Sequence, residues 1–313
     1  RSQGRVYFSD DREFLSFSRV WIHTAHLPIA VIVPATAHDV EMAINVLRDR
    51  DIPFRIRSGG HHKLGYSTIR NGVVLNLSEL NKVEFLDDTK NVVRLGPAVT
   101  SAHFYQQLTK TTNMAAVTGF CGRVAESGFV LGGGFGLLSR RYGLGLDNVI
   151  SFQIVLANGT MIHAATDDDL DWALRGAGSG SFGVVTSMDY KVYATSKILP
   201  FVSVVLPDRN MRADFLYELP KTSPNVVAMY NMKDRINIMW SGSTDAEALY
   251  GETYLKNLVV DWVANASYVQ STMTWDDLYG DQSIVPKNGW GESVYAAACW
   301  TGFLMPINHT KAI

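Results

Sequence analysis

Three glycine-rich stretches are the parts of this sequence whose residue types could do chemistry. They read Arg57-Ser-Gly-Gly-His61, Gly132-Gly-Gly-Phe-Gly136 and Gly176-Ala-Gly-Ser-Gly-Ser-Phe-Gly183. Glycines let backbone N–H groups converge on phosphate oxygens because no Cβ stands in the way. Each stretch alone could be an ordinary turn, since short glycine motifs occur often. Together they favour a large cofactor that carries phosphate groups.

Two common nucleotide-binding motifs are the alternatives for these loops. Gly178, Gly180 and Gly183 satisfy the G-x-G-x-x-G pattern of a dinucleotide-binding fold, which requires a strand before it and a helix after it. Here the sequence predicts the reverse order, with a helix over 168–174 and a β-branched strand from residue 184. The P-loop pattern G-x-x-x-x-G-K-S/T does not occur in the sequence. Neither motif therefore accounts for the loops.

Two histidines, His61 and His62, follow the first loop directly. Paired histidines could bind a metal ion, but no Cys, Asp or Glu lies nearby at ligand spacing. They could also be structural histidines. A histidine in a phosphate-type loop is a more specific arrangement than either alternative, so we predict a role beside the cofactor and no metal site.

The composition limits the classes of protein to which the chain can belong. Its 313 residues, 47% apolar and 19% charged, suffice for one large or two ordinary globular domains. A formal net charge of −2 provides no basic field for nucleic acid or an anionic membrane. The apolar runs are far shorter than the ~20 residues needed to cross a bilayer. We expect a small-molecule substrate and neither a nucleic-acid nor a membrane partner.

Cysteines and glycosylation motifs bear on the cellular compartment. Cys121 and Cys299 are the two cysteines, so one disulfide is possible but no disulfide framework. A start at Arg1 without an apolar signal core is typical of a processed or partly observed chain. Four Asn-x-Ser/Thr motifs would permit glycosylation of a secreted protein, and on this ground we expect an extracellular location. The four acceptors are Asn76, Asn158, Asn265 and Asn308.

The elements that position the loops follow from the apolar periodicity. In the first part of the chain a helix opens at 36–39 and another covers 100–109, and Asn158-Gly159 predicts a hairpin turn. A further helix covers 167–174. The strands expected there are 29–33, 54–57, 72–77, 92–95, 150–156, 161–164 and 184–192. Beyond a boundary near 195–200, strands at 201–206, 226–232 and 235–241 and a helix over 246–258 predict a second α+β domain with a β-sheet.

Taken in order, these motifs resemble the FAD-linked oxidases of the vanillyl-alcohol oxidase superfamily, and within it the berberine-bridge-enzyme-like group. The likeness covers most of residues 28–195. The resemblance implies an α+β fold, with a two-subdomain PCMH-type FAD-binding domain over 1–195 and an α+β substrate domain with an antiparallel sheet over 196–313. The motifs that carry it are Pro34, Asp39-Val40, the first loop, Gly119-Phe-Cys121, Gly132–Gly136, Arg141-Tyr-Gly-Leu144, Asp147-Asn148 and Gly176–Thr186.

The resemblance implies covalently bound FAD. In the family the histidine after Ser-Gly-Gly is joined to the flavin, and His61 matches it. In members with two bonds a cysteine before the second glycine-rich loop forms a thioether, and Cys121 matches it, with a small buried apolar residue as the alternative. Val124 matches a position near the flavin that is associated with oxygen access. The expected cofactor-binding residues are Arg57, Ser58, Gly59, Gly60, His61, His62, Gly119, Cys121, Val124, Ser127, Gly128, Leu131, Gly132, Gly133, Gly134, Gly136 and Val185.

The activity implied by the resemblance is that of an oxidase. A hydride would pass from a substrate alcohol carbon to FAD, and dioxygen would reoxidise the flavin to give hydrogen peroxide. We favour the anomeric hydroxyl of a sugar, as in a carbohydrate oxidase. The alternatives are an oxidoreductase of secondary metabolism that acts on an alkaloid or phenolic substrate, and a degenerate flavoprotein without catalysis.

Three features depart from the family. Gly122 stands where a Pro is common, and Phe129 stands where a His is common. The family usually continues to a segment with an Asn-Tyr signature, which is not found here, so we expect the substrate domain to be incomplete at its C-terminus. No catalytic residue can be assigned. We interpret the stretch Trp275-Asp-Asp-Leu-Tyr279 as a helix start with an acidic first turn rather than a catalytic site.

Overall fold

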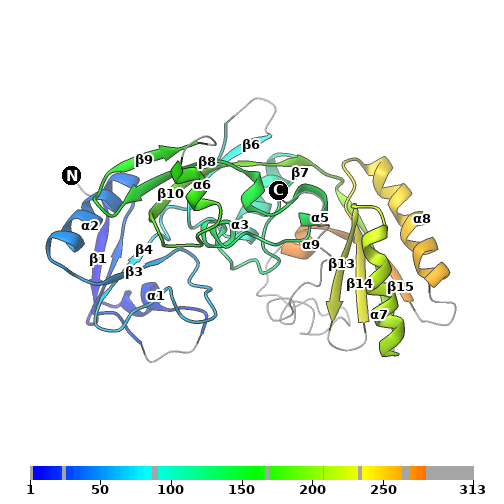
Figure 1. Cartoon of the computed structure of the whole chain (residues 1–313), viewed down its shortest axis with the longest axis horizontal. Coiled ribbons are helices and arrows are strands. Elements are labelled where there is room, and N and C mark those ends of the chain that lie inside the picture. Colours follow the sequence, from blue (N-terminus) through cyan, green and yellow to red (C-terminus); the bar gives the residue numbers. More distant parts are fainter. Residues whose placement is uncertain are drawn as a thin grey trace. The chain divides into compact units, whose positions relative to one another are not determined.

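The computed structural model describes residues 3–22, 26–86, 91–165, 169–206, 208–231, 235–262 and 268–279. The chain divides into two compact units, and Figure 1 gives the labels of their elements. The first unit holds residues 1–104, 123–135 and 144–192, and the second holds 105–122, 136–143 and 193–313. The expected division at residue 195 remains a prediction. Among the described residues, no helix is long and apolar enough to cross a membrane.

The N-terminal sheet of the first unit has the strand order β1-β2-β4-β3. Strands β2 and β3 each pair with β4 in the parallel sense, and β1 pairs with β2 in the antiparallel sense. All four residues of β4 are buried, as expected for a parallel strand that is covered on both faces. The elements are β1 (Arg5–Phe8), α1 (Phe14–Ser18), β2 (Ala30–Val33), α2 (Ala37–Asp49), β3 (Phe54–Arg57) and β4 (Val73–Asn76).

Helix α2 begins where the sequence predicts it. The Thr36 side chain accepts a hydrogen bond from the Asp39 N–H at 3.1 Å, and the Asp39 carboxylate accepts one from the Thr36 N–H at 3.0 Å. This reciprocal pair is a capping box, which satisfies N–H groups that the first helical turn leaves unpaired. The apolar residues on one face of α2, the last of which is Leu47, are buried.

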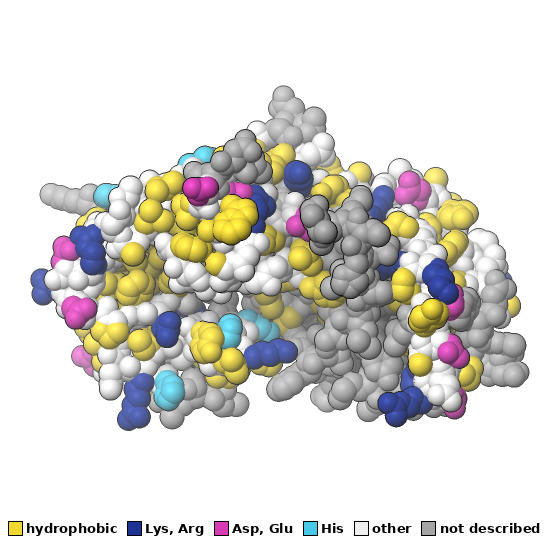
Figure 2. Space-filling model, viewed as in Figure 1, with side chains coloured by type: hydrophobic (Ala, Val, Ile, Leu, Met, Phe, Trp, Pro, Cys, Tyr) yellow, Lys and Arg dark blue, Asp and Glu magenta, His cyan; other side chains and the backbone are white. Residues whose placement is uncertain are grey.

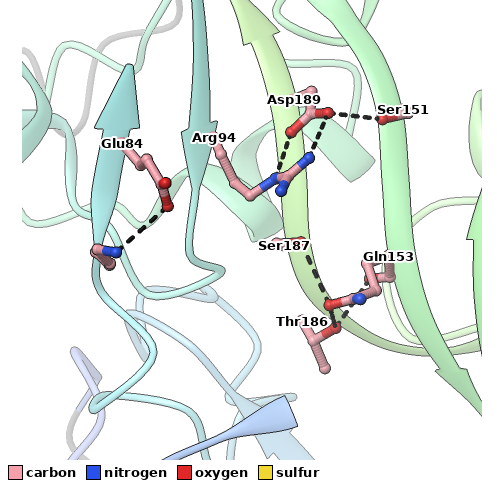
Figure 3. Close-up of polar contacts among 8 residues, drawn as sticks. Glu84, Arg94, Ser151, Gln153, Thr186, Ser187 and Asp189 are labelled. Carbon is pink, nitrogen blue, oxygen red and sulfur yellow. Dashed lines mark hydrogen bonds and ion pairs between the residues drawn. The ribbon is translucent and has the colours of Figure 1, made fainter. Parts of the chain in front are cut away.

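The other sheet of the first unit is antiparallel, in the order β5-β6-β10-β8-β9. Figure 3 shows polar side chains across three of its strands: Arg94 donates two hydrogen bonds to Asp189, at 2.8 and 3.0 Å, and Ser151 donates a third at 3.2 Å. The Asn158-Gly159 dipeptide forms the predicted turn between β8 and β9. The strands are β5 (Val83–Phe85), β6 (Val92–Leu95), β8 (Val149–Leu156), β9 (Met161–Ala164) and β10 (Gly183–Lys191).

Short helices connect these sheets. Helix α4 (Glu126–Leu131) follows directly on a bridge between Thr100 and Ala125, and α6 (Asp169–Leu174) lies between β9 and β10. Helix α3 (Ser101–Thr111) starts in the first unit and continues into the second. The remaining connecting elements are β7 (Met114–Ala115), α5 (Ser139–Tyr142), η1 (Leu146–Asn148) and β11 (Tyr193–Ala194).

The second unit is built on an antiparallel sheet in the order β13-β14-β12-β15. Its core joins buried side chains of β12 and β14 to those of helix α8. The predicted α+β class with an antiparallel second sheet is thereby confirmed. The elements are β12 (Ile198–Val205), α7 (Arg209–Glu218), η2 (Leu219–Lys221), β13 (Val226–Asn231), β14 (Arg235–Trp240), α8 (Asp245–Trp262), β15 (Tyr268–Thr274) and α9 (Trp275–Tyr279).

Charged side chains are distributed singly over the face that Figure 2 shows, and they do not gather into a large patch of one sign. This distribution agrees with the near-neutral composition of the chain.

Candidate functional site

A cavity of about 460 Å³ lies within the first unit. Strand β3, the first glycine-rich loop, the start of α4, strand β8 and the end of the third glycine-rich loop contribute to its wall. The structure therefore brings together two of the three loops that the sequence singles out. The predicted site residues that line this cavity are Ser58, Gly59, Gly60, His61, His62, Val124, Ser127, Gly128, Leu131 and Val185.

The first loop and the start of α4 meet because Gly59 has no side chain. A Cβ on Gly59 would lie 2.9 Å from the Ala125 backbone nitrogen, which is closer than real Cβ contacts. Gly60 has a φ of +68°, in the left-handed region that favours glycine. The Ser-Gly-Gly sequence is thus required for two chain segments about 65 residues apart to form one wall.

The backbone N–H groups in this wall are suited to binding an anion. Among the described residues, no protein acceptor pairs with the N–H groups of Ser58, Gly59 and Gly60. The same holds for Ser127 and Gly128 in the first turn of α4, whose N-cap makes no side-chain hydrogen bond. Free N–H groups around one cavity suit phosphate oxygens.

The third loop is anchored at its base and open at its tip. Arg175 makes a bidentate ion pair with buried Asp171 and donates to the carbonyls of Leu146 and Val149 at 3.0 Å. A Cβ on Gly178 or Gly180 would meet no atom within 4 Å. Helix α6 precedes the loop and strand β10 follows it, so the order that argues against a dinucleotide-binding fold is confirmed.

His61 lines the cavity with its ring stacked on Trp21, at 4.8 Å between centroids and 23° between planes. Burial lowers the pKa of His61, and the positive charges of Arg123 and Lys63 lower it further, against a hydrogen bond to its own backbone that raises it. A pKa below the ordinary value keeps the ring mostly unprotonated at pH 7. That is the state a nucleophilic attachment requires.

His62 is held in a different way. Its ring stacks on Tyr66 at 4.5 Å, and its Nδ1 accepts a hydrogen bond from the Leu64 N–H at 3.1 Å. One of its nitrogens is thus engaged within the loop itself, which favours a structural role in shaping the cavity wall.

Four predicted residues of the first unit lie outside the cavity lining. Arg57 ends β3, burial lowers its pKa, and its buried Nε has no partner among the described residues. Gly132, Gly133 and Gly134 instead form the turn that leaves α4. The Gly134 carbonyl accepts from the Gly145 N–H at 2.6 Å, and a Cβ on Gly134 would meet Gly145 at 3.0 Å. These glycines permit close backbone packing behind the wall.

The remaining predicted residues, Gly119, Cys121 and Gly136, belong to the second unit. Gly136 packs on Thr118, whose carbonyl would lie 2.1 Å from a Cβ at that position. Cys121 lies outside the lining of the cavity. The thioether that the resemblance implies for Cys121 remains a prediction.

Tyr279, the last residue of the stretch Trp275–Tyr279, has a structural role. Its ring stacks on Tyr105 at 4.0 Å, and its hydroxyl lies 3.3 Å from the Thr118 hydroxyl. The side chain is buried in the core of the second unit. Helix α9 begins at Trp275, as predicted, with the Asp277 carboxylate accepting from the Thr274 N–H at 2.7 Å.

The cavity also has apolar walls that the motifs do not identify. Strand β3, helix α2 and strands β8 and β10 supply aliphatic and aromatic side chains beside the backbone donors. Donors next to apolar surface fit a cofactor that joins phosphates to flat rings, so the residues present fit FAD. The available signals were helical periodicity for Ile44 and the apolar pattern in or next to the strands for the others. These residues are Ile44, Phe54, Ile56, Leu77, Val155 and Val184.

Glu126 is a buried acid that the motifs also miss. It begins α4, it is fully buried, and its Oε1 accepts a hydrogen bond from the Ser101 hydroxyl at 2.7 Å. Its Oε2 has no partner among the described residues. Burial raises the pKa of Glu126 to about 8, so the carboxyl is mostly protonated at pH 7. It ties the cavity wall to the start of α3 as a neutral group.

Comparison with known proteins adds the following. A family model described as an FAD binding domain matches residues 28–165. (R)-6-hydroxynicotine oxidase from Paenarthrobacter nicotinovorans is 33% identical over 241 residues, which cover 76% of this chain and 49% of that protein. The chain thus spans about half the length of this relative.

Two solved structures share the fold. The berberine-bridge-enzyme-like protein 1 of Physcomitrella patens has a TM-score of 0.78 at 23% identity, covering 89% of this chain and 62% of that one. Glucooligosaccharide oxidase from Acremonium strictum, which carries a 6-S-cysteinyl, 8α-N1-histidyl FAD, has a TM-score of 0.75 at 21% identity, covering 91% and 63%. These comparisons confirm the resemblance that the motifs indicate: residues 28–165 match an FAD-binding domain, and the chain shares the fold of the berberine-bridge-enzyme-like proteins.

Proposed function

We propose that the protein is an FAD-dependent oxidase that removes a hydride from a substrate carbon and passes the electrons to dioxygen. The observation that carries this proposal is the cavity of the first unit. There the N–H groups of the first loop and of the start of α4, which have no acceptor among the described residues, and the His61 ring border apolar walls. When bound, FAD would supply the hydride acceptor. The protein would hold its phosphates with backbone donors and its rings against the apolar side chains.

We propose that FAD is attached covalently to His61. The attachment exchanges one C–H bond of the flavin methyl group and one imidazole N–H for a C–N bond. The two electrons and two protons released reduce the flavin, and dioxygen takes them up to give hydrogen peroxide. A low pKa supports this role, because only an unprotonated ring nitrogen can form the bond.

We also propose a second covalent bond, between FAD and Cys121. Glucooligosaccharide oxidase shares the fold and carries both a histidyl and a cysteinyl linkage to FAD. Cys121 in the stretch Gly119-Phe-Cys121 stands at the position that the resemblance assigns to the cysteinyl linkage. The thiolate is the reactive form of cysteine, so the second bond would require Cys121 in its reduced form.

For the substrate we propose the anomeric hydroxyl of a mono- or oligosaccharide. Support comes from the sugar oxidase among the fold neighbours. The second candidate is an alkaloid-type substrate, and it is favoured by the higher sequence identity to a 6-hydroxynicotine oxidase. Both reactions would draw a hydride from carbon to the same flavin, so they differ in the groups that recognise the substrate.

The first experiment is acid precipitation of the purified protein, followed by the visible spectrum of pellet and supernatant. Yellow pellets from the wild type and from Cys121→Ala, but colourless pellets from His61→Ala, would support attachment at His61 alone. A pellet that loses colour only when both residues are replaced would support two bonds. Flavin that washes free from the wild type would refute covalent attachment.

Peroxide production then tests the activity, on a panel of mono- and oligosaccharides and on 6-hydroxynicotine. Turnover on sugars supports the carbohydrate oxidase, and turnover on the nicotine derivative supports the alternative. Bound flavin with no peroxide on either panel would instead support a degenerate flavoprotein.

A further inference from the structure

The segment after helix α1 lies against the loop that carries His61. The Asn76 side chain donates to the Phe17 carbonyl at 2.8 Å, and the Trp21 N–H donates to the Gly60 carbonyl at 2.8 Å. A Cβ on Gly65 would lie 2.9 Å from the Ile22 side chain. The backbone around Trp21 is therefore fixed to the sheet at one end and to the histidine loop at the other.

The Trp21 ring covers one face of His61 from a position outside the cavity lining. The two rings stack at 4.8 Å, and His61, but not Trp21, lines the cavity. The torsion that orients a histidine ring has broad, roughly two-fold preferences, and the hydrogen bond of His61 to its own backbone is one restraint on it. An aromatic neighbour on one face adds a second restraint on the ring plane.

The neighbouring His62 stacks on a residue of its own loop, unlike His61. Its partner Tyr66 belongs to the same loop and is 61% exposed. The ring of His61 is instead held by a residue from a separate segment, which is itself anchored to the sheet through Asn76 and Phe17. Of the two adjacent histidines, His61 is the one whose ring is also restrained from outside its own loop, by Trp21.

We propose that Trp21 is a positioning residue for flavin attachment: by stacking on His61 it fixes the plane of the imidazole, so that one ring nitrogen faces the cavity in a single orientation. This inference rests on the proposed attachment at His61. Formation of a bond depends steeply on the orientation of the attacking atom, and a displacement of about 1 Å can cost 10²-fold in rate. Binding of FAD without a bond depends instead on the backbone donors, which Trp21 does not supply.

The test separates attachment from binding. Apoprotein from a riboflavin-starved host is mixed with FAD, and acid-stable flavin is followed over time, while the affinity for FAD is measured by flavin fluorescence in the first minutes. We expect Trp21→Leu to slow attachment at least tenfold and to change the affinity less than threefold. Trp21→Phe, which keeps a ring on His61, should restore most of the attachment rate.

Trp172→Leu is the matched control, because Trp172 is 80% exposed on α6 and should tolerate the same exchange without effect. The ring protons of His61 in the apoprotein give a second readout: the Trp21 ring current should shift them upfield, and Trp21→Leu should abolish the shift. Attachment at the wild-type rate in Trp21→Leu would overturn the proposal, as would parallel loss of affinity and attachment. A wild type that binds FAD but never attaches it would refute the proposed covalent linkage and this inference with it.

Discussion

Replacement of Glu126 by glutamine should stabilise the protein in a pH-dependent way. The carboxyl is fully buried, with Ser101 as its hydrogen-bond donor, and its pKa is raised from 4.5 to about 8 by burial. The unfolded chain releases this proton near pH 4.5, whereas the folded chain keeps it up to about pH 8. As the pH rises between these two values, the unfolded state is therefore favoured more and more. Glutamine has the same shape and no proton to lose.

The size of the effect follows from the separation of the two pKa values. A separation of about 3.5 pH units, at 1.36 kcal/mol per unit, corresponds to roughly 5 kcal/mol in the free energy of unfolding above pH 8. At pH 7 the same relation gives about 3 kcal/mol. Below pH 4.5 the difference disappears, because both states hold the proton. Glu126→Gln and the wild type should then be equally stable apart from the altered hydrogen bond to Ser101.

The assay is urea unfolding of the wild type and Glu126→Gln at several values between pH 4 and pH 9. We expect the two curves to coincide at pH 4 and to separate progressively up to pH 8, with the variant more stable. Glu84→Gln is the matched control, since the Glu84 side chain is 49% exposed and should give no pH-dependent separation. A difference between the wild type and Glu126→Gln that is independent of pH would refute the reasoning that a neutral acid holds this wall.

Further predictions concern the loops and the surface. Gly59→Ala should abolish FAD binding, because its Cβ would meet the neighbouring backbone nitrogen at 2.9 Å, whereas Gly176→Ala, with no atom within 4 Å, should bind normally in the same fluorescence titration. Arg175→Lys should lower the free energy of unfolding by about 1–3 kcal/mol in chemical denaturation, since a lysine cannot replace the bidentate pair and both carbonyl contacts; unchanged stability would contradict this. We propose that the protein is secreted. Expression through a eukaryotic secretory pathway should then add a glycan at exposed Asn158 and none at buried Asn76, as detected by endoglycosidase treatment. A glycan at Asn76 would contradict the burial of that side chain. The motifs at Asn265 and Asn308 lie outside the described residues.

Sequence patterns predicted the helices and turns that are specified by residues close together in the chain. The apolar periodicity that opens at 36–39 predicted α2, and Asn158-Gly159 predicted the turn between β8 and β9. Helices α4 and α7 were not among the predicted elements. Helix α4 has six residues and starts without a side-chain cap, and the apolar and polar residues of α7 are weakly segregated, so neither gives a strong periodic signal.

By itself, the sequence determined that the chain carries three glycine-rich loops and that the third loop is not a dinucleotide motif, and it predicted His61 as the site of the proposed flavin attachment. These conclusions depend on residue type and spacing. Tertiary structure alone decided that Gly59 lies against Ala125, that Trp21 covers His61, and that Glu126 is buried with a raised pKa. The physical reason is that close packing, ring stacking and desolvation depend on residues far apart in the chain, which local periodicity does not encode.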